Sequence, residues 1–174
     1  QKTLLDKIKK THPAESPFLK RTDSHFSGSV LNRLLKIKQF ILDLQEKNDP
    51  CFPFFKLALG SILIRSSRLT RSPSLGYPRK EKIVSPKDPY IFYIEKISQI
   101  ISDLEWAQKN TKNTTECQII NGDSRKIKEY GHKIDMAITS PPYVNGMDYV
   151  INYKIENAWL DFAKTYGELK ELKD

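Results

Sequence analysis

Residues 133–143, Lys-Ile-Asp-Met-Ala-Ile-Thr-Ser-Pro-Pro-Tyr, are the most informative part of the sequence. Residues 134–139 form a short apolar run with an acid near its start, which predicts a buried strand. A serine, two prolines and a tyrosine follow at once, and proline cannot continue a central strand. At ordinary proline usage this whole combination is rare by chance, so it is a specific signal.

The elements around this run predict a parallel α/β sheet. Residues 117–120 form another β-like run, closed by an Asn-Gly turn, and a short helical stretch over 124–130 follows. Beyond residue 143 we expect an amphipathic helix, because apolar residues there are spaced four, four and three apart: Ile151, Ile155, Trp159 and Phe162. Strand, helix, strand, loop and helix in this order are typical of a doubly wound α/β fold.

Upstream, the pattern is helical. Apolar residues recur every three or four positions over 30–44 and 88–108, and residues 54–65 are apolar nearly all round, which predicts three helices. We therefore expect three parts: a polar N-terminal segment at 1–23, a mainly α-helical region at 24–112, and a partial α/β segment at 113–174.

The positive charge is concentrated in the first half of the chain. The net charge is +8, and residues 1–90 hold 18 Lys or Arg against 8 Asp or Glu. This excess suits a polyanionic partner, although a solvated lysine-rich surface would have the same composition. The basic loop at 65–82 interleaves cations with small residues and a tyrosine, which suits phosphate contacts, unless it is a solvated loop without a partner. The candidate DNA-binding residues are Arg65, Arg68, Arg71, Arg79 and Lys80.

Other classes of protein fit the sequence poorly. The longest apolar run, 52–64, is short and interrupted, and the chain opens without a signal peptide, so we expect no membrane association. The two cysteines lack metal-ligand spacing, and the histidines are scattered and read as ordinary surface residues. We expect no metal site, and buried thiols in a reducing compartment, the cytoplasm.

The loop at 140–143 has a specific chemical use. Ligands of an open α/β sheet bind outside the carboxyl ends of its strands, where this loop lies. Proline has no backbone N–H, so the Pro141 carbonyl stands as a fixed acceptor. Together with the Ser140 hydroxyl it can accept both N–H groups of a base's exocyclic amino group, which turns the nitrogen lone pair toward an incoming methyl. Tyr143 offers a flat face on which an extruded base can stack.

These residues resemble the catalytic motif of DNA N4-cytosine and N6-adenine methyltransferases. Gly-Asp-Ser at 122–124 and Val-Asn-Gly-Met-Asp-Tyr at 144–149 extend the resemblance on both sides. It implies part of a Rossmann-like S-adenosylmethionine-dependent methyltransferase sheet, with DNA as partner in a restriction-modification-type system. The residues that hold the target amino group would be Ser140, Pro141, Pro142 and Tyr143. Serine in the first position favours N4 of cytosine.

By the same resemblance, Asp123 contacts the cofactor's adenine or shapes its pocket, although an aspartate there also suits a turn or a helix N-cap. Asp148 and Tyr149 either order the loop over the base or begin the next helix. The family's Phe-x-Gly-x-Gly cofactor loop is missing, since no two of the seven glycines are spaced two apart.

The missing loop, in a chain that begins with Gln1, predicts an internal fragment that is inactive alone. The cofactor half would then belong to the remaining part of the same enzyme or to a complementary subunit. The alternatives are a catalytically incomplete DNA-binding paralogue or subunit, and an N6-adenine or RNA amino-methyltransferase.

Overall fold

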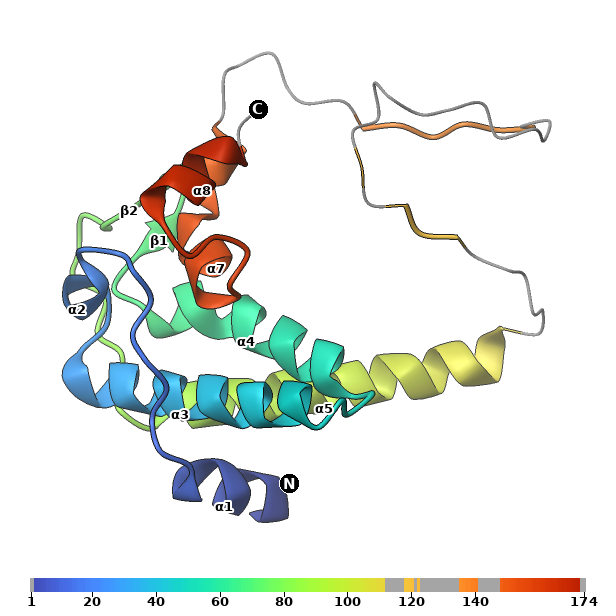
Figure 1. Cartoon of the computed structure of the whole chain (residues 1–174), viewed down its shortest axis with the longest axis horizontal. Helices are drawn as coiled ribbons and strands as arrows, with labels where there is room; N and C mark the ends of the chain where they lie inside the picture. Colours follow the sequence, from blue (N-terminus) through green and yellow to red (C-terminus); the bar gives the residue numbers. More distant parts are fainter. Residues whose placement is uncertain (1, 112–117, 121, 123–134, 141–147, 173–174) are drawn as a thin grey trace.

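The computed structural model describes residues 2–111, 118–120, 122, 135–140 and 148–172. Helices dominate this part of the chain, and α3, α4 and α5 form its centre (Figure 1). The short helix α1 packs on α3, and α7 packs on α4. The helices are α1 (Lys2–Lys10), α2 (Thr22–His25), α3 (Gly28–Glu46), α4 (Phe52–Ser66), α5 (Asp88–Asn110), α6 (Tyr149–Asn152), α7 (Lys154–Trp159) and α8 (Tyr166–Glu171).

The three helices predicted upstream are confirmed as α3, α4 and α5. The break between α3 and α4 has a local cause. Asn48 adopts a left-handed backbone conformation, with φ of 52°, which asparagine tolerates better than most residues. The Asp49 carboxylate then accepts a hydrogen bond of 2.8 Å from the Cys51 backbone N–H and shapes the start of the next helix.

The buried side chains form one hydrophobic cluster that joins distant parts of the sequence. Its centre comes from α3, α4 and α5, but Ile8 of α1 and Trp159 of α7 are also buried in it. The first 23 residues, expected only as a polar segment, therefore contribute to the core. The cluster also crosses the boundary that we predicted between residues 112 and 113, because α7 belongs to it.

Within the described residues, strands occur only inside the basic loop. β1 (Thr70–Arg71) and β2 (Leu75–Gly76) form an antiparallel hairpin, with Thr70 opposite Gly76 and Arg71 opposite Leu75. The strands predicted over 117–120 and 134–139 are absent at their described residues, 118–120 and 135–139, which are exposed. A strand needs a neighbour to pair its backbone groups, and no described residue pairs with these. The parallel sheet therefore stays a prediction.

The amphipathic helix predicted over 151–162 is wrong in its length. It is divided into α6 and α7, and it ends at Trp159. Ile155 and Trp159 are buried as the spacing predicts, but Ile151 and Phe162 are 49% and 60% exposed. The chain turns away after α7 because Asp161 is left-handed, with φ of 57°.

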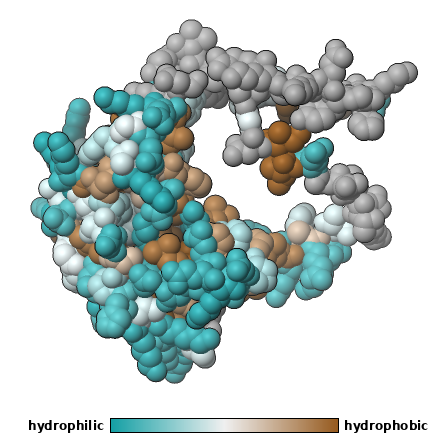
Figure 2. Space-filling view, in the orientation of Figure 1, coloured by the Kyte–Doolittle hydropathy of each residue, from teal (hydrophilic) through white to brown (hydrophobic). Residues whose placement is uncertain are grey.

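The far half of α5 keeps an apolar face that the described residues leave uncovered. Ile97 is buried, whereas Ile101 and Leu104 on the same stripe are about half exposed. Figure 2 shows hydrophobic surface, in brown, over this part of α5 and over α4. Trp106, near the C-terminal end of α5, is 68% exposed. None of the described helices is long and apolar enough to cross a membrane.

Candidate nucleic-acid interface

Of the predicted catalytic loop, the structure describes only Ser140, which is exposed and lies in no regular element. Pro141, Pro142, Tyr143 and the candidate cofactor residue Asp123 lie outside the described residues. The loop leads to α6, where the Asp148 carboxylate accepts a hydrogen bond of 2.9 Å from the Ile151 backbone N–H. Of its two predicted roles, that of a helix N-cap is confirmed.

The candidate DNA-binding arginine Arg71 fastens the β1–β2 hairpin to the C-terminal helices. Its Nη2 donates to both carboxylate oxygens of Glu156, at 2.8 and 3.0 Å, and to the Asn152 carbonyl at 2.8 Å. The guanidinium also lies 4.2 Å from the centre of the Tyr153 ring. On the other strand, the Leu75 backbone N–H donates to the Asn152 side chain. Arg71 thus joins a loop to α6 and α7 across more than 80 residues of sequence.

Arg65 forms a more exposed pair on α4. Its guanidinium donates to the Glu95 carboxylate at 2.9 Å and stacks on the Phe92 ring, 3.6 Å from the ring centre. Both partners of the ion pair keep more than half of their side chains in contact with solvent. Such pairs are weak, so Arg65 can exchange its carboxylate for a phosphate at little cost.

Arg68 and Arg79 line a surface cavity of about 450 Å³, which we call the Arg79 cavity. Lys80 is exposed in the loop beside it. The remaining lining residues are Ser24, Tyr77, Pro78, Glu81 and Lys82.

Lys82, one of the lining residues of the Arg79 cavity, stabilises the fold of the loop. Its ammonium donates to the backbone carbonyls of Ile64 and Leu69, at 2.7 and 3.2 Å, and so ties the loop to the end of α4. Burial lowers the pKa of Lys82 below its ordinary value.

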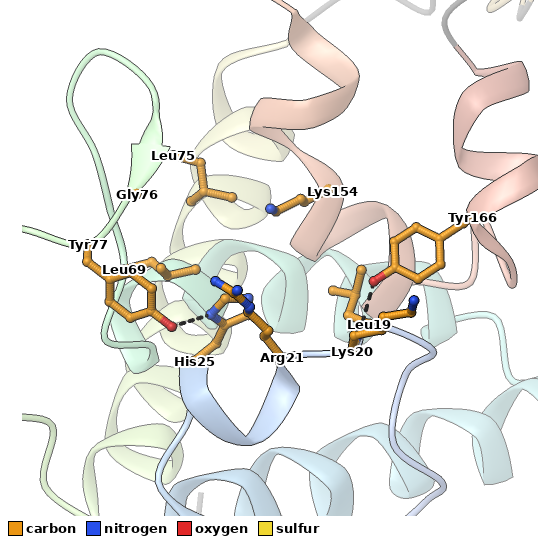
Figure 3. A pocket seen from close by; sticks show the side chains of 10 residues that line it. All are labelled: Leu19, Lys20, Arg21, His25, Leu69, Leu75, Gly76, Tyr77, Lys154 and Tyr166. Carbon is orange, nitrogen blue, oxygen red and sulfur yellow. Dashed lines mark hydrogen bonds between the residues drawn. The ribbon is translucent and has the colours of Figure 1, made fainter.

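A second cavity, of about 390 Å³, is also lined by Tyr77, and we call it the His25 cavity (Figure 3). The Tyr77 hydroxyl and the His25 Nδ1 are hydrogen-bonded at 2.9 Å and close one end of it. At the other end, the Tyr166 hydroxyl accepts a hydrogen bond of 3.0 Å from the Lys20 backbone N–H. The remaining lining residues are Leu19, Arg21, Leu69, Leu75, Gly76 and Lys154.

His25 corrects one expectation, because it is buried rather than an ordinary surface histidine. Its backbone carbonyl also accepts a hydrogen bond from the Arg68 N–H, which links α2 to the basic loop. Burial lowers the pKa of His25 below its ordinary value, and the positive charges of Lys154 and Arg21 lower it further. No short sequence pattern could have revealed this site, because its lining residues come from four distant segments.

Elsewhere, no group of three or more His, Cys, Asp or Glu side chains among the described residues is arranged to hold a metal ion. Comparison of the chain with protein-family models, with curated proteins and with solved structures finds no match.

Proposed function

We propose that this chain is a segment of an S-adenosylmethionine-dependent DNA amino-methyltransferase that modifies N4 of cytosine, in a restriction-modification-type system. The observation that carries the proposal is the motif Ser140-Pro141-Pro142-Tyr143 directly after an apolar run. Its hydroxyl and carbonyl acceptors match the two N–H donors of a base amino group, and its tyrosine matches the face of an extruded base. We place the enzyme in the cytoplasm, where DNA and a reducing environment are both present.

The methyl donor does not fit a site formed by this chain alone. The sequence has no Phe-x-Gly-x-Gly loop, and the one candidate cofactor residue, Asp123, is outside the described part. We therefore propose that this chain holds the target amino group and contacts DNA. The remaining part of the enzyme, or a complementary subunit, would hold S-adenosylmethionine.

The cations of the basic loop support a DNA-binding role to different degrees. Arg71 donates from Nη2 to both oxygens of the Glu156 carboxylate, so it is least available to a phosphate. Arg68, Arg79 and Lys80 have no ion pair with a described residue and are the better candidates. Replacing these three by alanine should weaken DNA binding at every sequence and reduce its salt dependence, while Arg65→Ala should have a smaller effect. An unchanged salt dependence would show that the three residues do not contact the DNA phosphates.

The chemistry is tested by reconstituting this chain with the rest of its enzyme and measuring methylated nucleosides in DNA by mass spectrometry. The wild type should produce N4-methylcytosine. Ser140→Ala should lower the rate roughly 100-fold or more, since a fixed hydrogen-bond partner of the reacting group is lost.

Ser29→Ala, at an exposed serine in the first turn of α3, is the matched control and should retain full activity. If the product is N6-methyladenine, the target base is adenine instead of cytosine. If only RNA is methylated, the substrate is RNA instead of DNA. Equal rates for the two serine variants would contradict the proposed role of the loop.

A catalytically incomplete DNA-binding subunit is the second candidate, and the missing glycine loop favours it. In that case DNA binds, but no methylated nucleoside forms with any partner. Methyl transfer by the isolated chain would contradict both this candidate and our assignment of the methyl donor to another part of the enzyme.

A further inference from the structure

The His25 cavity concentrates positive charge without a compensating acid. Three of its lining residues, Lys20, Arg21 and Lys154, are cations, and none is an aspartate or a glutamate. In Figure 3 the Lys154 side chain extends from α7 toward the cavity, which Arg21, at the start of α2, also lines. Chain segments far apart in the sequence therefore bring their charges to one concave surface.

The cations of this cavity have no carboxylate partner among the described residues. Lys38, Arg65 and Arg71 each form an ion pair. By contrast, no described acid lies within ion-pair distance of Lys20, Arg21 or Lys154. Like charges held together on a concave surface repel one another, and a bound anion removes that repulsion.

The walls of the cavity suit more than a simple inorganic ion. Leu19, Leu69 and Leu75 provide apolar surface, and Tyr77 and Tyr166 add aromatic rings. The hydrogen bonds of the two phenols, to His25 and to the Lys20 backbone, hold both rings in place. A volume of about 390 Å³ lies within the range of small-ligand sites, roughly 300–1,000 Å³.

We propose that the His25 cavity binds a phosphate ester of nucleotide type, with the phosphate on Arg21 and Lys154 and the nucleoside against the leucines and Tyr77. Either a free nucleotide or one nucleotide of a nucleic-acid strand has this chemistry. The site goes beyond the proposed function, because binding here requires no methyl transfer and no residue of the 140–143 loop.

The first test follows the His25 imidazole of the wild-type 174-residue chain by NMR during pH titration. The titration is made without additive, with sodium chloride at matched ionic strength, with inorganic phosphate, and with deoxyadenosine 5′-monophosphate. The nucleotide should raise the pKa of His25 more than the chloride does, because a bound anion opposes the charges of Lys154 and Arg21. The proposal would be overturned if neither the nucleotide nor a short single-stranded oligonucleotide raised the pKa of His25 beyond the rise with chloride.

The second test compares affinities. The double variant Arg21→Ala, Lys154→Ala should bind the nucleotide at least about tenfold more weakly. The control, Lys47→Ala with Lys170→Ala, makes the same change in net charge at exposed positions that line neither cavity. Urea unfolding and circular dichroism establish that both variants are folded. Equal affinities in the two variants would refute the site, whatever the outcome for methylation.

A third arm separates the two sources of the phosphate. If the monophosphate binds, a free nucleotide is sufficient to occupy the site. Binding of a short single-stranded oligonucleotide, but not of the monophosphate, with the same loss in the double variant, assigns the site to a strand. Failure of both ligands to bind would overturn the proposal.

Discussion

Replacing Trp159 by alanine tests how firmly the C-terminal helices are joined to the helical core. Trp159 is 1% exposed and lies against Phe26 in an edge-to-face arrangement, with ring centres 5.3 Å apart and planes at 66°. Truncating a buried tryptophan to alanine costs about 3–5 kcal/mol. The ring pair accounts for roughly 0.5–1.5 kcal/mol of this loss. Since folded domains are stable by about 5–15 kcal/mol, the variant should lose a large share of its stability.

The measurement is the free energy of unfolding in urea, followed by far-UV circular dichroism. Trp106→Ala is the matched control, because Trp106 is 68% exposed on α5 and its loss should change stability by no more than about 0.5 kcal/mol. A double-mutant cycle with Phe26→Leu isolates the ring pair. If Trp159→Ala costs no more than Trp106→Ala, the packing of α7 against the core is refuted.

Four further substitutions test the contributions of single residues. Arg71→Ala should lower the free energy of unfolding by about 2 kcal/mol, because it removes charge-assisted hydrogen bonds to a largely buried glutamate. Arg65→Ala should lower the free energy of unfolding by less than about 1 kcal/mol, because its ion pair is exposed. If urea unfolding shows the same loss for Arg65→Ala and Arg71→Ala, the two ion pairs do not differ as proposed. Asp161→Asn should cost about 1–3 kcal/mol, since asparagine keeps the left-handed backbone but leaves the buried Lys38 ammonium without its carboxylate at 2.7 Å. When Lys38 is also replaced by methionine, Asp161→Asn should no longer lower the free energy of unfolding measured in urea. Finally, because the pKa of His25 is lowered on folding, the unfolded chain takes up the proton first, and stability should fall as the pH drops below about 6.5. His25→Gln should flatten this part of the profile of urea midpoints against pH, and an unaltered slope would exclude His25 as its source.

Much of the helical architecture could be predicted from local patterns. The three- and four-residue spacing located α3 and α5, because one face of each helix must be apolar to pack, and a run that is apolar nearly all round located α4. The same spacing marked Ile155 and Trp159 as buried. It failed beyond Trp159, where the left-handed Asp161 turns the chain and leaves Phe162 exposed. Periodicity describes which face would be buried, but not where the backbone changes direction.

The chemistry of the loop at 140–143 can be predicted from the sequence because the residues that would provide it are consecutive. The roles of the cations are different, since each depends on a partner far away in the chain. Arg65 and Arg71 look alike in the sequence of the basic loop, yet Arg65 pairs with Glu95 in solvent and Arg71 pairs with the largely buried Glu156 of α7. The His25 cavity likewise exists only where α2, the hairpin and the C-terminal helices meet. Ion pairing and concavity are properties of long-range packing, so folding separates the structural cations from those left free to meet a phosphate.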